Sequence, residues 1–153
     1  MSVEARLKEL NITLPNPPAP VASYVPYVVS GKLVYISGQV TLTPEGLKYV
    51  GTVGSDLTVE DGKAAARLCA LNVIAQVKAA CGGDLDRVKR VVKVTVFVNA
   101  VPGFAQHPEV ANGASDLFVE VFGDAGRHAR AAVGVGSLPR NVATEVEAVI
   151  EIA

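Results

Sequence analysis

The segment from Ala64 to Val77 places the strongest constraint on the fold, because nearly all of its side chains are apolar or small. Its polar exceptions are Arg67, Asn72 and Gln76. Thr58 followed by Asp61 has the form of an N-cap with an acid in the first turn, and Gly82-Gly83 is a helix stop, so one helix should run to about Ala80. A helix this apolar has to be covered on more than one side, as it is when it lies on a β-sheet.

Strand patterns for such a sheet lie before and after this helix. Tyr24 to Val29 and Leu33 to Ile36 are rich in β-branched and aromatic residues, and the turn Ser30-Gly31-Lys32 between them predicts a hairpin. From Val92 to Val98, valine occupies every second position, which predicts a strand with its valines on one face.

A second helix is predicted from about Pro108 to Phe122, followed by two strands, Ala129 to Val135 and Val142 to Ile152. The apolar stripe of this helix consists of Val110, Ala114, Leu117, Phe118 and Val121. The order hairpin, helix, strand, helix, strand, strand predicts an α+β fold with a mixed sheet and two helices on one face. The other face would need its own cover, and identical sheets from neighbouring subunits would supply it.

The first 20 residues differ from the rest of the chain. Val3 to Leu10 has the pattern of a short amphipathic helix, and three prolines between Asn16 and Val21 predict an extended connector. We therefore expect a helix and connector over 1–20 and a single domain over 21–153. The N-terminus lacks the apolar core of a signal peptide, and the two cysteines, Cys69 and Cys81, are typical of a reduced compartment, so the expected location is the cytoplasm.

The charge balance excludes some function classes. With 14 basic and 15 acidic residues, the chain has no field that would hold a polyanion, so we expect no nucleic-acid partner. The basic cluster from Arg87 to Lys93 is read as a solvated sheet edge, with RNA contact as the alternative. No apolar run is long enough for a membrane span. Two histidines and two cysteines give no metal set with sensible spacing, and no phosphate loop or dinucleotide motif occurs, so no cofactor is expected.

Arg130 is the first candidate site residue. On an alternating strand it shares a face with Ala132, Gly134 and Gly136, which leaves open space around its guanidinium. That arrangement suits bidentate capture of a carboxylate. The alternative is a structural ion pair with Glu145 or Glu147 of the last strand.

Glu145 is the second candidate. It shares one face of the last strand with Glu147 and Glu151, so it either belongs to a solvated face or positions a water in an enclosed site. If the last two strands form a plain hairpin near Pro139, Arg130 lies opposite a residue near Val149. That register separates the two charges by about 13 Å along the strands, so a bulge, a wide loop or another subunit would have to complete the site.

Two further side chains are candidate site residues, Tyr24 and His128. Tyr24 could supply a ring wall or a hydroxyl, or simply pack as an aromatic residue. His128 shares the Arg130 face if that strand begins early, where it would shuttle protons or remain a surface histidine.

Several motifs together resemble the RidA/YjgF family over nearly everything from Val21 to Ile152. The segments that carry the resemblance are Ala129–Val135, Leu138-Pro139, Glu145–Ala148, Val34–Gln39 with its Ser-Gly-Gln end, and Lys93–Val98. The resemblance implies a chorismate-mutase-like α+β fold and a homotrimer with three clefts between subunits. It also implies cofactor-independent deamination of 2-imino acids to 2-oxo acids and ammonia.

The same resemblance implies roles for individual residues. Arg130 falls where the family has its carboxylate-binding arginine, and Glu145 where it has its water-orienting glutamate. The substrate-binding positions correspond to Tyr24, Ser37, Gly38 and Asn112.

This chain also departs from the family pattern. The family's frequent cysteine two residues after the arginine is Ala132 here, and the N-terminal helix and connector suggest a distinct branch. Two other functions therefore stay open: a non-catalytic regulatory trimer that binds small carboxylates, and the endoribonuclease (L-PSP) activity often attached to the family.

Overall fold

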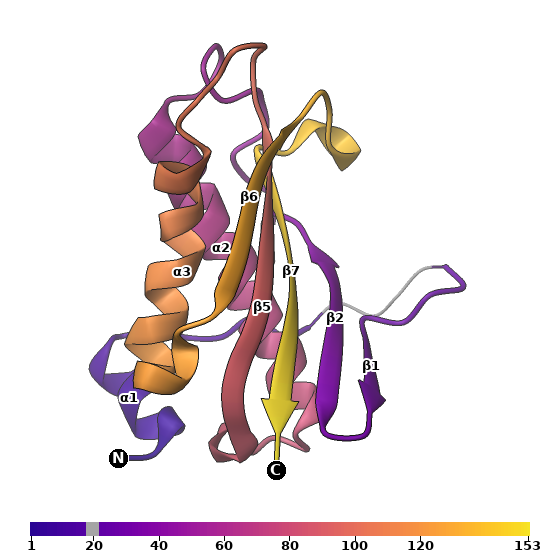
Figure 1. The fold of residues 1–153 in the computed structure, drawn as a ribbon, viewed down its shortest axis with the longest axis vertical. Coiled ribbons are helices and arrows are strands. Elements are labelled where there is room, and N and C mark those ends of the chain that lie inside the picture. The colour runs from indigo at the N-terminus through magenta and orange to yellow at the C-terminus, as the bar shows by residue number, and fades with distance from the viewer. Residues whose placement is uncertain (18–21) are drawn as a thin grey trace.

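The computed structural model describes residues 1–17 and 22–153. Five strands form one mixed sheet in the order β1-β2-β7-β5-β6, in which only the β5–β6 pair is parallel (Figure 1). Their bounds are β1 (Tyr27–Ser30), β2 (Leu33–Gln39), β5 (Val88–Asn99), β6 (Ala129–Val135) and β7 (Thr144–Ile152). The predicted mixed sheet is confirmed.

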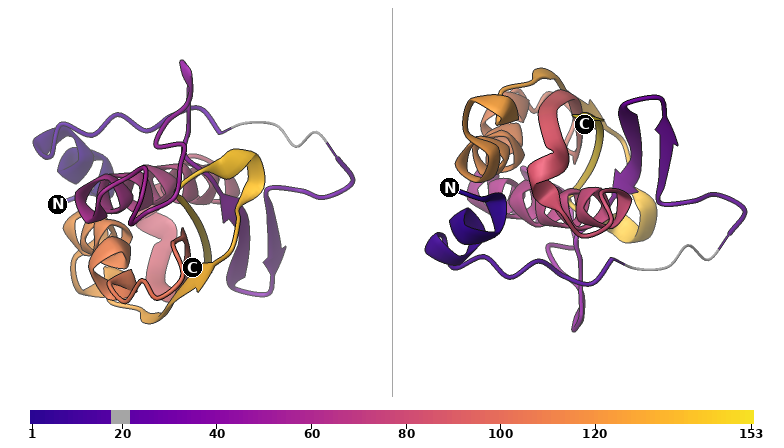
Figure 2. Two further views of the ribbon diagram at one scale, coloured as in Figure 1. Left: turned by 90° about the horizontal axis from the view of Figure 1, so that it is seen from above. Right: turned by 90° about the horizontal axis from the view of Figure 1, so that it is seen from below.

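Two long helices, α2 (Val59–Ala80) and α3 (His107–Phe122), pack side by side on one face of the sheet (Figures 1 and 2). The predicted N-cap of α2 is confirmed as a capping box, in which Thr58 and Asp61 each accept a hydrogen bond from the other's backbone N–H. All five residues of the predicted α3 stripe are buried. Burial against the sheet therefore explains the apolar composition of both helices.

The last strand shows how the sheet divides its two faces. Its helix-facing residues are buried, and they are Val146, Ala148, Ile150 and Ile152. The alternate residues point to the opposite face, as the alternation predicted, and they are Glu145, Glu147, Val149 and Glu151. On that opposite face Tyr35 is 47% exposed and Val133 is 42% exposed, so a single chain leaves apolar surface uncovered there. Coverage by neighbouring subunits stays a prediction.

Two strand predictions need correction. The first strand begins at Tyr27, so Tyr24 lies in the loop before it. The valine alternation in β5 also fails at Val92, which is 37% exposed while Val91 is buried. The reason is a β-bulge, since the pairing with β7 shifts by one residue between Val91 and Lys93.

The hairpin considered for the last two strands is wrong. β6 pairs with β5 in parallel, and β7 pairs with the other side of β5, so β5 separates the two strands. The connection from Gly136 to Ala143 contains the short 3-10 turn η3 (Pro139–Asn141), and it is long enough to pass the end of β5.

The N-terminal helix α1 (Val3–Glu9) packs onto the domain. Leu7 is buried, the Glu4 carboxylate lies 2.9 Å from the Lys78 ammonium, and Arg6 donates to the Glu120 carbonyl. Residues 12–17 have no regular secondary structure, and the rest of the predicted connector, 18–21, lies outside the described residues.

The remaining elements are short. They are β3 (Leu42–Thr43), β4 (Gly46–Leu47), η1 (Leu85–Arg87) and η2 (Gly123–Gly126). None of the helices in the described ranges is both long and apolar enough to cross a membrane.

Gly113 sets the distance between α2 and α3. A Cβ at this position would collide with the Lys63 backbone carbonyl of α2, which cannot move without shifting the helix. Because Asn112 and Ser115 flank this contact on α3, the approach of the two helices also determines where those side chains lie.

We therefore expect Gly113→Ala to lower the free energy of unfolding by about 2 kcal/mol, in spite of the better helix propensity of alanine. Gly136→Ala is the matched control, because a Cβ there meets nothing within 4 Å. It should change stability by no more than about 0.5 kcal/mol. Urea unfolding measures both variants, and equal losses would contradict the packing argument.

Candidate active site

One pocket gathers most of the predicted site residues. It has a volume of about 550 Å³ and lies where β2, β7 and the η3 loop meet. Its lining consists of Tyr24, Ser37, Gly38, Val40, Leu47, Pro139, Arg140 and Glu145. Four of the six residues predicted as site residues therefore belong to one concave surface.

A β-bulge shapes this pocket. The pairing of β2 with β7 jumps from Ile36 to Gln39, so Ser37 and Gly38 stand opposite Glu147 alone. At Gly38 the Glu145 carboxyl fills the space that a Cβ would occupy. The acid therefore lies directly against the backbone of Gly38, and a side chain at this position would displace the Glu145 carboxyl.

Ser37 has a structural task in the pocket. Its hydroxyl donates to the Val25 carbonyl at 2.7 Å, and its backbone N–H donates to the Pro26 carbonyl at 2.9 Å. Both bonds fasten the segment that carries Tyr24, whose side chain is 59% exposed at the pocket. Tyr24 is accordingly a wall of the pocket and not part of the core.

Glu145 is half-buried, and burial raises the pKa of its carboxyl, with a further rise from the nearby charge of Glu147. No ion pair with Arg140 or any other cation forms within the described residues. A carboxyl group with a raised pKa exchanges protons closer to neutral pH, which suits acid–base work.

Arg130 lies outside this pocket, on the helix-covered side of the edge strand β6. Its Nη1 donates to Asn112 Oδ1 at 2.8 Å and to Ser115 Oγ at 3.1 Å, both on α3. Ser115 Oγ in turn lies 2.9 Å from His128 Nε2, and His128 Nδ1 lies 2.6 Å from the Gly126 carbonyl oxygen. The predicted pair of Arg130 and Asn112 is brought together.

His128 is part of this hydrogen-bonded group and is not a free surface histidine. Burial lowers the pKa of its ring, the Gly126 hydrogen bond opposes that change, and the charge of Arg130 lowers the pKa further. The ring of Phe118 meets it edge-on at 5.7 Å between centroids. His128 therefore favours its neutral form.

Arg130 and Glu145 do not meet within one chain. Arg130 aligns with Val94 of β5, which aligns with Ala148 of β7, three residues from Glu145. An odd number of residues places the two side chains on opposite faces, with offsets of about 10 Å along the strands and about 10 Å across them. The alternative reading of Arg130, an ion pair with Glu145 or Glu147, is absent from the described part of the chain.

The sequence reading missed Ser115 and Arg140. Ser115 follows Asn112 by three residues, so one helix face presents both to β6, and this polar pair beside an apolar stripe was the available signal. Arg140 had no such signal. It lines the pocket from η3, where Arg140 and Asn141 both have left-handed backbones, with φ of 55° and 61°.

Cys69 does not contribute a nucleophile to the Glu145 pocket or to the group around Arg130. It is fully buried beneath β7, and burial raises the pKa of its thiol to about 12. The reactive thiolate is therefore not formed at neutral pH.

Known proteins resemble this chain over nearly its whole length. Residues 4–152 match the family model described as "YjgF/chorismate mutase-like, putative endoribonuclease". Protein TCP17 of Trypanosoma cruzi is 53% identical over 151 residues, which cover 98% of this chain and 94% of TCP17. The 2-iminobutanoate/2-iminopropanoate deaminase of Salmonella typhimurium is 34% identical over 138 residues, covering 90% of this chain and 94% of the deaminase.

A solved structure extends the likeness to the fold. The crystal structure of Atu1372 from Agrobacterium tumefaciens, a protein of unknown function, is 48% identical and superposes with a TM-score of 0.92. The match covers 99% of this chain and 92% of Atu1372.

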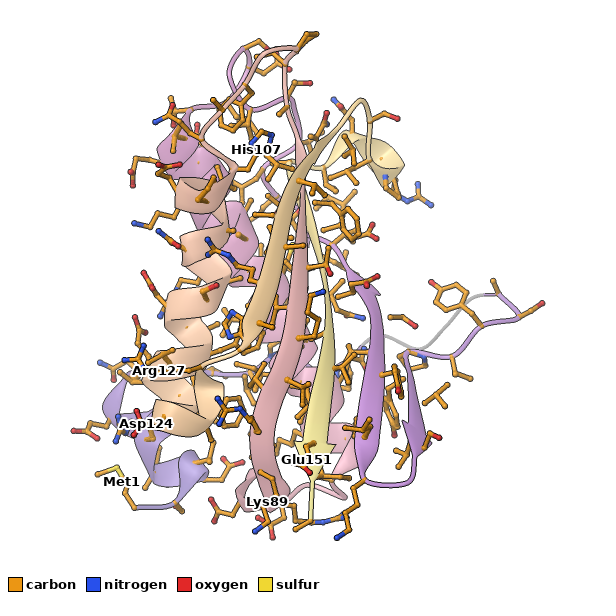
Figure 3. The ribbon with its side chains drawn as sticks, viewed as in Figure 1. Met1, Lys89, His107, Asp124, Arg127 and Glu151 are labelled. Carbon is orange, nitrogen blue, oxygen red and sulfur yellow. The ribbon has the colours of Figure 1, made fainter. Side chains whose placement is uncertain are left out.

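The charge of Arg130 beside His128 can be tested by its effect on the pKa of that histidine. Arg130→Met removes the charge that helps to lower the pKa of His128, so that pKa should rise. NMR titration of the ring protons measures it, with His107 as internal reference. Figure 3 labels His107 near one end of α3 and Arg127 near the other. Ser115 and Phe118, which contact the His128 ring, follow His107 by eight and eleven residues, so the reference is separate from the site of the change. An unchanged His128 titration would contradict the contact.

The raised pKa of Glu145 predicts how the stability of the fold depends on pH. An acid with a raised pKa stabilises the fold at pH values below its ordinary 4.5, and this stability is lost as the pH rises through the higher folded-state value. Glu145→Gln should therefore raise the melting temperature at pH 7, and the gain should vanish near pH 4. Glu151→Gln on the same strand face is the control. A gain that persists unchanged at pH 4 would argue against a titration effect.

Proposed function

The chain belongs to the RidA/YjgF family, and on that premise we propose that it hydrolyses reactive 2-imino acids to 2-oxo acids and ammonia in clefts between its subunits. The observation that carries this proposal is the division of the site. One half holds a guanidinium fixed by Asn112 and Ser115, and the other holds a half-buried acid in a pocket.

The two halves have complementary chemistry. Arg130 would bind the substrate carboxylate in a bidentate manner, which orients the neighbouring imine carbon. Glu145 would take a proton from water as the water oxygen bonds to that carbon, and would pass this proton to the nitrogen, which gives a carbinolamine. It would then take the proton of the carbinolamine hydroxyl and deliver it to the nitrogen, so that the carbonyl forms as the C–N bond breaks and ammonia leaves. An imine is already electrophilic, so positioning and proton transfer are sufficient, and no cofactor is required.

Assembly follows from the distance between the halves. Because Arg130 and Glu145 point to opposite faces of one sheet, a complete site needs Arg130 from one subunit and the Glu145 pocket from another. The uncovered apolar face around Tyr35 and Val133 supports contact between sheets. We propose a homotrimer with three such clefts, with Tyr24, Ser37 and Gly38 lining each one.

Neither alternative function gains support from the geometry. In the basic cluster, Arg87 donates to the Ala153 carbonyl and Arg90 to the Arg127 carbonyl, so two of its guanidinium groups already bind backbone. A net charge of −1 also gives little attraction for RNA. A trimer that binds carboxylates without turnover would use the same cleft, and only an activity assay separates it from the deaminase.

Arg130→Ala should abolish the acceleration of 2-iminobutanoate hydrolysis, because the substrate loses its carboxylate anchor. Release of 2-oxobutanoate measures the rate, and a mass measurement should find the oligomer intact. Arg127→Ala is the control, since this exposed arginine only pairs with Asp124. Unchanged hydrolysis by Arg130→Ala would contradict the assignment.

Mixing two inactive variants tests the shared cleft. Arg130→Ala and Glu145→Gln should each be inactive, yet subunits exchanged between them in equal amounts should recover about a quarter of wild-type activity, because that share of clefts receives both intact residues. No recovery after verified subunit exchange would place Arg130 and Glu145 in separate functions.

A further inference from the structure

A chain of hydrogen bonds links Arg130, Ser115, His128 and Gly126, and the donor and the acceptor of each bond can be assigned. The Gly126 carbonyl can only accept, so the proton of the neutral His128 ring is on Nδ1, 2.6 Å away. Nε2 is then an acceptor, and the Ser115 hydroxyl 2.9 Å away donates to it. Ser115 Oγ accepts from Arg130 Nη1 at 3.1 Å, because a guanidinium can only donate.

This direction decides which edge of Arg130 is free. Nη1 has two protons, and they go to Ser115 Oγ and to Asn112 Oδ1. Nε and Nη2 have no acceptor among the described residues, and they lie on one edge of the planar group. That edge matches the two oxygens of a carboxylate.

We propose that Ser115 and His128 are positioning residues, which hold Arg130 with its Nε–Nη2 edge free for the substrate carboxylate. The inference rests on the proposed function, because it takes Arg130 as the carboxylate anchor. It adds to that function a reason for the affinity of the anchor: the guanidinium is oriented before the ligand arrives.

Orientation matters because an arginine side chain has several rotatable bonds. A free arginine side chain loses rotamer entropy when a ligand immobilises it, and one whose guanidinium is already held loses less. Asn112 alone would fix one nitrogen and leave rotation about that contact. Ser115 supplies the second contact, and His128 keeps the Ser115 lone pair directed at Arg130 by taking its proton.

The relay depends on an unprotonated Nε2. A protonated ring would donate from Nε2 as well and would turn the Ser115 hydroxyl away. Arg130 is the charged group that faces His128, while α3 presents Ser115 and Phe118 to the ring and η2 presents only the Gly126 carbonyl. All of these neighbours are compatible with a neutral ring.

Paired variants test the proposal, with 2-oxobutanoate as a non-reacting carboxylate probe. Ser115→Ala and His128→Phe break the relay and should raise the Kd for 2-oxobutanoate, and the KM for 2-iminobutanoate, roughly tenfold, with a smaller change in kcat. Ser115→Thr keeps the hydroxyl and His128→Gln keeps a neutral acceptor, so both should recover most of the affinity. Asp116→Asn, exposed on the next position of α3, is the control.

The outcomes separate this inference from the proposed function. If Arg130→Ala loses the probe while Ser115→Ala and His128→Phe bind as wild type does, the positioning role is overturned. A loss of kcat with unchanged KM would overturn it too, because the pair would then act in the chemistry. If wild type hydrolyses no imine but the binding pattern holds, the deaminase proposal fails and the positioning role stands.

Two remaining results are equally informative. If wild type binds no 2-oxobutanoate, both the anchor and its positioning are overturned. Thermal unfolding is measured for every variant. If Ser115→Ala or His128→Phe is unfolded, the affinities of Ser115→Thr and His128→Gln are compared with that of Asp116→Asn instead. An affinity for 2-oxobutanoate below that of Asp116→Asn would then overturn the positioning role.

Discussion

The two-sided alternation of the β-sheet is the constraint on which the rest of this molecule depends. Because successive residues of a strand point to opposite faces, β7 presents buried valine and isoleucine to the helices and Glu145 to the other side. The same rule in β6 turns Arg130 toward α3. One chain therefore cannot place its two principal charges in one site, whatever rotamers they adopt, and the proposed shared site needs a second chain.

Much of this arrangement could be predicted because it follows from local patterns. The capping box at Thr58, the α3 stripe and the alternation in β7 are each set by neighbours within a few residues, and all are confirmed. The position of β6 was not predictable in this way, since the sequence of a strand does not say which edge of β5 it joins. The bulges at Val92 and at Ser37-Gly38 depend likewise on the partner strand.

The site residues also divide into those that the sequence indicated and those that only tertiary contacts bring together. Arg130 and Glu145 stood out by their place in motifs, and Asn112 was implied by the family resemblance alone. The structure supplies each with surroundings that suit its proposed role. Ser115 and His128 become a pair only when α3 packs against β6, which the glycine at 113 permits by letting α3 approach α2 closely. A tertiary contact of this kind leaves no spacing signal between residues 115 and 128.

The environments of Glu145 and His128 differ in a way that fits the division of labour. Burial disfavours the charged form of both, but the consequence is opposite: the pKa of the acid rises toward neutral pH, while that of the histidine falls below its ordinary range. Glu145 is thereby prepared to exchange a proton, and His128 to remain an acceptor. Under the proposed function, the Arg130 half would hold the carboxylate with the guanidinium as its cation, because burial and the charge of Arg130 both disfavour a protonated His128 ring.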